Sequence, residues 1–161
     1  MNTLVVYSSL DGNTKAAAER IAKELGCKTM GIEPEKPITN KGFMKILVGG
    51  KQSAFNEKPA IKPLGADLAE YDMIVLGTPV WAGKAAAPVW TFANSCDACE
   101  KVIALFTLSG SGENEKCLKQ LKNVFPGIRI SASLKDKKAD KNGENEEMLA
   151  AFIAQLRAAA Q

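Results

Sequence analysis

Short apolar runs alternate with amphipathic segments along the chain. Residues 3–8, 73–77 and 102–107 form nearly continuous apolar runs, which is typical of strands buried on both faces. Less regular runs at 27–32 and 127–134 predict two more strands. Apolar residues recur at helical spacing between them, as at Ala18, Ile21, Ala22 and Leu25. This spacing predicts helices over 14–25, 113–124 and 143–159, a helix with Pro88 in its first turn, and a short helix ending before Gly49-Gly50.

The alternation of strand and helix defines the expected architecture. Five β-α repeats with apolar strands predict an α/β fold in which a parallel sheet is covered by helices on both faces. Right-handed crossovers make this a doubly wound five-stranded parallel sheet of order 2-1-3-4-5, and we expect a single domain over residues 1–161. Ligands of such sheets bind beyond the carboxyl ends of the strands. The functional loops are therefore expected at 8–14, 77–84 and 107–112.

The first of these loops carries groups suited to an anion. Ser8, Ser9 and Thr14 supply hydroxyls, Gly12 lets the backbone close, and the following helix adds its positive dipole end. The lysine of a nucleoside triphosphate loop and the G-x-G-x-x-G dinucleotide fingerprint are both absent from the sequence. The plainer alternative is a polar turn in which Asn13 or Thr14 caps the helix.

Composition narrows the chemistry. The sequence has no histidine, which excludes Ser-His-Asp and Cys-His nucleophile systems and histidine-rich metal sites. No apolar run reaches the roughly 18 residues of a membrane span, and the start of the chain is not typical of a signal peptide. Four cysteines predict a reducing, cytoplasmic setting. The Cys96–Cys99 pair has redox spacing but falls at the end of a predicted helix, which favours coincidence.

The basic excess is concentrated in one segment. Between Lys36 and Lys62 there are six lysines (36, 41, 45, 51, 58 and 62) against Glu57 alone, a net charge of +5. Arginine is scarce, so nucleic acid is not an expected partner. A solvated lysine-rich face is the plain interpretation, and a docking surface for an anionic partner or a phosphate-bearing substrate is the sharper one.

The three loops together resemble those of flavodoxins. Residues 7–14, Tyr-Ser-Ser-Leu-Asp-Gly-Asn-Thr, are similar to the family's phosphate loop. Residues 77–83, Gly-Thr-Pro-Val-Trp-Ala-Gly, resemble the second loop, in which an aromatic residue packs on the flavin ring. Residues 107–112, Thr-Leu-Ser-Gly-Ser-Gly, match the third loop in position and in small side chains. The resemblance extends over nearly the whole chain.

The resemblance implies a flavodoxin-like fold that holds FMN without a covalent bond. Ser9, Asn13 and Thr14 would hold the phosphate, Trp81 would stack on the isoalloxazine, and backbone groups of the third loop would meet its pyrimidine edge. The implied cofactor-binding set comprises three groups: Ser8, Ser9, Leu10, Asp11, Gly12, Asn13 and Thr14; Pro79, Val80, Trp81, Ala82 and Gly83; and Thr107, Leu108, Ser109 and Gly110. Trp90, in the following helix, is expected in the core.

Three departures from the family pattern bear on function. Asp11 stands where threonine is common, the third loop lacks a flavin-covering tyrosine, and the net charge is positive. The leading hypothesis is an electron-transfer protein that acts between redox partner proteins. The alternative is an NAD(P)H-dependent quinone or flavin reductase that uses an open flavin face. A further alternative is a domain that binds an anion other than flavin.

Overall fold

Five parallel strands form the centre of the molecule. In the computed structural model, which describes residues 1–39, 43–55, 57–97 and 99–161, the strand order is β2-β1-β3-β5-β6. These strands are β1 (Thr3–Tyr7), β2 (Lys28–Gly31), β3 (Met73–Trp81), β5 (Val102–Ser109) and β6 (Ile130–Lys135). The short β4 (Lys84–Ala85) pairs only with β3 among the strands described. The predicted order 2-1-3-4-5 is confirmed, because β4 is a hairpin arm outside the parallel path.

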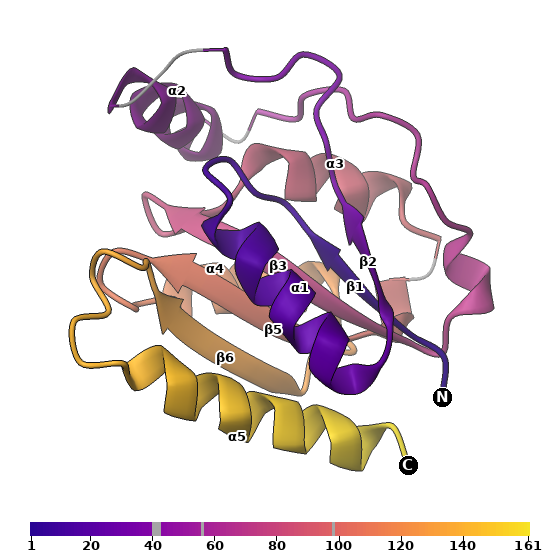
Figure 1. Ribbon diagram of the computed structural model, residues 1–161. Coiled ribbons are helices and arrows are strands. Elements are labelled where there is room, and N and C mark those ends of the chain that lie inside the picture. Colours follow the sequence, from indigo (N-terminus) through magenta and orange to yellow (C-terminus); the bar gives the residue numbers. More distant parts are fainter. Residues whose placement is uncertain (40–42, 56, 98) are drawn as a thin grey trace.

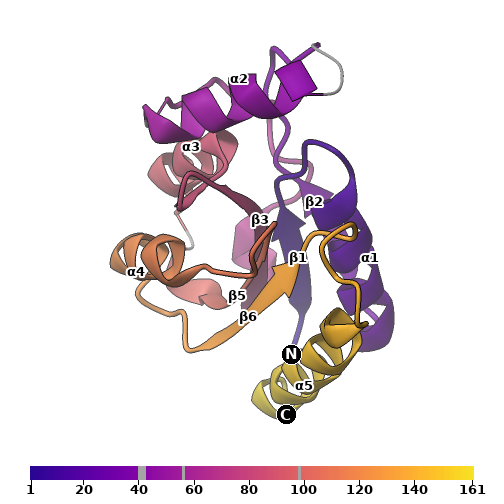
Figure 2. The ribbon, with the colours of Figure 1, turned by 90° about the vertical axis from the view of Figure 1, so that its left-hand side faces the viewer.

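Helices cover both faces of the sheet (Figures 1 and 2). On one face, α1 (Asn13–Leu25) and α5 (Glu144–Ala159) pack on alternate strand residues around Phe106 and Phe152. On the other, α3 (Ala87–Ser95) and α4 (Glu115–Val124) enclose Phe92, Leu121 and Phe125. Of the apolar residues at helical spacing in α1, Ala18, Ile21 and Ala22 are buried and Leu25 is partly buried. In α5, Phe152, Ile153 and Leu156 are buried and Met148 is partly buried. Each helix therefore buries the stripe that its apolar spacing defines.

The two helices on the first face are also linked by charge. The Arg20 guanidinium of α1 forms a two-pronged ion pair with Glu146 of α5, and Arg157 of α5 lies 3.0 Å from the carboxylate of Glu24 in α1. These pairs are partly exposed, so they orient the two helices more than they stabilise them.

One helix lies at the edge of the sheet where the strands end. Helix α2 (Phe43–Ala54) contacts β3, β4 and α3, and Figure 2 shows it above α3 beside the turn that follows β1. The expectation of a short helix ending before Gly49-Gly50 is wrong, because the helix continues through both glycines. Two short 3₁₀ helices, Leu68–Glu70 and Cys99–Lys101, precede β3 and β5. Among the described residues, no helix combines the length and apolar character needed to cross a membrane.

Candidate functional site

The turn between β1 and α1 presents backbone donors at a helix N-terminus. Gly12 is the N-cap with φ at 93°, a left-handed conformation that glycine adopts readily. Its N–H donates to Ser9 Oγ at 3.1 Å. The alternative in which Asn13 or Thr14 caps the helix is wrong, because α1 starts at Asn13 and its N-cap is Gly12, which has no side chain to make a cap hydrogen bond. First-turn N–H groups of a helix have no intrahelical acceptor, so this turn suits an anion.

Asp11 already engages part of that turn. Its carboxylate accepts from the Asn13 backbone N–H at 3.2 Å and from the Asn13 side-chain amide at 3.0 Å. Asp11 also helps to raise the pKa of Asp136, although burial of Asp136 is the larger cause. Two carboxylates therefore stand near the α1 N-terminus. An anion that binds at this turn is therefore repelled by the Asp11 carboxylate unless the Asp11 side chain moves away.

The second predicted loop is largely a strand. We expected a functional loop over 77–84, but β3 continues to Trp81 and pairs with β4, with Val80 opposite Ala85 and Trp81 opposite Lys84. Ala82 and Gly83 form the two-residue connection with φ of 51° and 72°, the positive pair typical of a type I′ hairpin turn. The buried Thr78 hydroxyl accepts the Ala86 N–H at 3.0 Å. Trp81 is thus held at the end of a hydrogen-bonded hairpin.

The Trp81 indole packs against α2. A Cβ built on Gly49 would lie 2.6 Å from Cζ3 of Trp81, so only glycine leaves room for the ring at this point of the helix. Trp81 is half-buried and borders the core. Trp90 in α3 is also half-buried and packs against the same core, with its indole nitrogen buried and without a hydrogen-bond partner among the described residues. The expectation that Trp90 belongs to the core is correct in position, although its side chain is not fully enclosed.

The third loop begins later than predicted. Thr107, Leu108 and Ser109 belong to β5, which pairs with β3 and β6 on its two sides, so only Gly110 of the predicted group lies beyond the ladder. The Ser109 hydroxyl accepts the Gly112 N–H at 2.8 Å and shapes the turn that follows. The Thr107 hydroxyl accepts from the side-chain amide of Asn114 at 2.9 Å. The small residues after Ser109 therefore form an ordered turn without an aromatic side chain.

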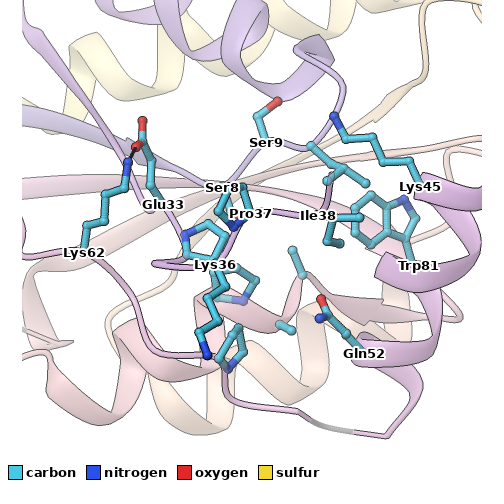
Figure 3. A pocket seen from close by; sticks show the side chains of 16 residues that line it. Ser8, Ser9, Glu33, Lys36, Pro37, Ile38, Lys45, Gln52, Lys62 and Trp81 are labelled. Atoms are coloured by element: carbon cyan, nitrogen blue, oxygen red, sulfur yellow. Dashed lines mark hydrogen bonds and ion pairs between the residues drawn. The ribbon is translucent and has the colours of Figure 1, made fainter. Parts of the chain in front are cut away.

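Two separate cavities contain part of the predicted site residues. A cavity of about 250 Å³ brings Ser8, Ser9 and Leu10 together with Trp81 and with Lys45 and Gln52 of α2 (Figure 3). A second, of about 860 Å³, is bordered by Val80, Ala82, Gly83, Ser109 and Gly110, with α4 beyond them. Val80 and Trp81 are consecutive residues of β3, and consecutive side chains of a strand point to opposite sides. The two cavities therefore lie on opposite sides of the hairpin. Asp11, Gly12, Thr14, Pro79 and Thr107 line neither cavity; Asn13 and Leu108 instead line a third depression beside α5.

The lysine-rich segment borders the first cavity. Lys36, Lys45 and Lys62 line it, and the Lys62 ammonium is paired with Glu33 at 2.8 Å. Lys51 and Lys58 are exposed, and Lys41 lies outside the described residues. Sequence reasoning singled out this segment without assigning Lys45 to the site. The local excess of lysine was the available signal, but α2 and the β1–α1 turn face one cavity through long-range packing, which has no local signature.

The cysteine pair lies at the other edge of the sheet, where β5 begins. Cys96 ends α3, and the Cys99 thiol donates to the Cys96 carbonyl at 3.0 Å. Burial is the main cause that raises the pKa of Cys99 to about 12. Both cysteines are free thiols, and Ala98 between them lies outside the described residues. This location, remote from the three loops, agrees with a coincidental C-x-x-C spacing.

A sheet of this order with its loops gathered at the carboxyl edge defines a doubly wound ligand-binding protein. The sequence model of the flavodoxin family matches residues 2–155, and the chain belongs to this family. No curated protein sequence matches the chain.

Solved structures agree with that assignment. A flavoprotein from Lactobacillus acidophilus NCFM, crystallised in complex with FMN, is 25% identical, with a TM-score of 0.67 over 91% of this chain and 97% of the other. A WrbA-like flavodoxin from Agrobacterium tumefaciens is 20% identical, with a TM-score of 0.63 over 99% and 98%. Oxidised flavodoxin 2 from Bacillus cereus is 16% identical, with a TM-score of 0.59 over 96% of each chain. The last two likenesses concern the fold alone.

The residues present fit FMN in chemical type. Ser9 and the half-buried Trp81 line the same cavity, where they offer a hydroxyl and a planar apolar surface. The α1 N-terminus follows the Ser9 turn directly and adds backbone N–H donors for a phosphate. The Asp11 carboxylate, which engages the same turn, is unfavourable for an anion. Family membership and the donor chemistry together support FMN as the cofactor.

Proposed function

We propose that this protein binds FMN non-covalently at the carboxyl edge of the sheet and carries electrons between redox partner proteins. The observation that carries the proposal is the shared cavity of the Ser9 turn and Trp81 in a chain of the flavodoxin family. When bound, FMN supplies the redox chemistry, and the protein supplies binding, orientation and electrostatics.

Each part of the chain then has a separate task. The first-turn N–H groups of α1, with Ser9, Asn13 and Thr14, hold the phosphate. Trp81 covers one face of the isoalloxazine and excludes water from it, and its position is fixed by the hairpin and by Gly49. Backbone groups near Ala82, Gly83 and Gly110 orient the ring edge.

The absorption spectrum of the purified protein, recorded before and after addition of FMN, tests cofactor binding. In a parallel titration followed by flavin fluorescence, we expect one-to-one binding with quenching of the fluorescence. Trp81→Ala should weaken this binding. Trp90→Phe is the matched control, because Trp90 lines neither cavity. A protein that ignores FMN at high concentration overturns the proposal and favours an anion other than flavin.

A reductase is the second candidate, and one observation favours it. The cavity beside Ser109 and Gly110 has no aromatic residue in its described lining, so nothing there covers the outer flavin face. That space suits a planar electron acceptor such as a quinone. Steady NAD(P)H oxidation by the FMN-loaded protein with a quinone, without an added reductase, identifies the reductase. Its absence, together with electron transfer from an added reductase, identifies the carrier.

A further inference from the structure

The first cavity contains three lysines, and only one of them directs its charge toward the Ser9 turn. Lys62 is neutralised by Glu33 at 2.8 Å. Lys36 is exposed, and in Figure 3 its ammonium extends away from the turn. Lys45, from the first turn of α2, extends toward Ser9 in the same view. Within the described part of the chain, Lys45 has no ion-pair partner, and its side chain is half-buried.

The position of Lys45 is fixed by the packing of its helix. Four residues further along α2, Gly49 lies against the Trp81 ring, and Lys84 Nζ donates to the Ala54 carbonyl at 2.9 Å near the helix end. Residues four apart share one face of a helix. The face that contacts Trp81 therefore also presents Lys45 to the cavity.

The turn opposite has a charge that needs compensation. Asp11 accepts the Asn13 N–H, and a phosphate dianion bound at the same turn adds two more negative charges beside it. Backbone N–H groups carry only partial charge, equivalent to about half a unit at a helix end. The ammonium of the half-buried Lys45, at the cavity wall, is placed to supply the missing unit of positive charge.

Resting on FMN as the cofactor, we propose that Lys45 of α2 is the cationic partner of the FMN phosphate. The lysine-rich segment thus contributes to cofactor recognition through this one residue. Lys45 makes the site discriminate FMN from riboflavin, which has the same ring system but no phosphate. The bond is a charge-assisted contact between an ammonium and a phosphate oxygen.

The test compares FMN and riboflavin affinities by fluorescence titration of the full chain. Lys45→Gln is expected to weaken FMN binding roughly tenfold, as loss of a charged hydrogen bond predicts, and to leave riboflavin affinity unchanged. Lys45→Arg should retain most of the FMN affinity. Lys51→Gln is the matched control, because Lys51 is an exposed lysine on the same helix and does not line the cavity. Ionic strength should weaken FMN binding less in Lys45→Gln than in the unaltered protein.

The contrary results are distinct. An FMN affinity of Lys45→Gln within twofold of Lys51→Gln overturns the role of Lys45 and leaves the cofactor assignment intact. An equal loss of FMN and riboflavin binding, or equal affinity of the unaltered protein for both, also overturns it, because the phosphate is then not read. Failure of the unaltered protein to bind either flavin instead overturns the proposed function. Far-UV circular dichroism of each variant verifies that it is folded.

Discussion

Helix α2 has two adjacent glycines in opposite surroundings, which makes them a matched pair for measuring its contact with Trp81. A Cβ on Gly49 would lie 2.6, 3.1 and 3.2 Å from three carbons of the Trp81 ring, whereas a Cβ on Gly50 would meet nothing within 4 Å. Gly49→Ala and Gly50→Ala therefore make the same chemical change with the same helical preference. Only the first of them forces the indole to move.

The two substitutions are expected to change the free energy of unfolding differently. Alanine is favoured over glycine inside a helix by about 1 kcal/mol, so Gly50→Ala should raise the free energy of unfolding by about that amount. Gly49→Ala has the same gain, but overpacking against a ring held between hairpin and helix costs about 1–3 kcal/mol. We expect Gly49→Ala to be neutral or destabilised by up to about 2 kcal/mol.

Urea unfolding followed by far-UV circular dichroism measures both variants. Adding each substitution to Trp81→Ala completes the design, because without the ring both alanines should stabilise the protein by about 1 kcal/mol. Equal stabilisation by the two alanines while Trp81 is present would refute the packing argument. So would a penalty at Gly49 that persists after the ring is removed.

Three further predictions concern the loops. Asp11→Asn should raise FMN affinity severalfold, because it removes a negative charge that engages the Asn13 N–H, and it should leave riboflavin affinity unchanged. Parallel titrations with FMN and riboflavin measure this. An unaltered FMN affinity contradicts the charge argument. Burial, and then Asp11, raise the pKa of Asp136 above that of an ordinary aspartate. The stability that this group contributes is therefore fully present below its unfolded pKa and is lost as the pH rises through its folded pKa. Asp136→Asn should therefore stabilise the protein at pH 7 but not at pH 3, and urea titrations at the two pH values measure this; equal effects at both are the contrary result. Ala82 has φ of 51°, a left-handed conformation that is strained for a residue with a Cβ. Ala82→Gly should therefore raise the free energy of unfolding, measured by urea denaturation, by about 0.5–1 kcal/mol. A loss of stability would contradict this strain.

The sequence was sufficient to predict the sheet order and the edge where the loops meet, because buried strands and helix stripes leave local patterns. It was insufficient for the β3–β4 hairpin. Proline disfavours a strand because it lacks a backbone N–H, but β1 pairs with β3 only as far as Gly77. Pro79 therefore lies beyond the part of β3 that pairs with β1, and no hydrogen bond to β1 is lost there.

Contacts between distant parts of the chain explain the other misses. Gly49-Gly50 reads as a helix end, and only the approach of Trp81, 32 residues later, explains why a glycine stands inside α2. The same helix places Lys45 beside the Ser9 turn. Periodicity reports which face of an element is apolar, but it does not report which distant residue will pack there.

The register of the central strands has a consequence for how the chain folds as it is synthesised. β1 pairs on one side with β2, but its other neighbour is β3, with Thr3 opposite Met73. A ribosome that adds about 5–20 residues per second needs roughly 4–14 seconds to synthesise the chain from Thr3 to Met73. During this time the β1 edge, with Leu4, Val5 and Val6, has no partner on the side that β3 later covers. The Ser9 turn and the Trp81 hairpin meet only when β3 docks, so the nascent chain forms the cavity between them late.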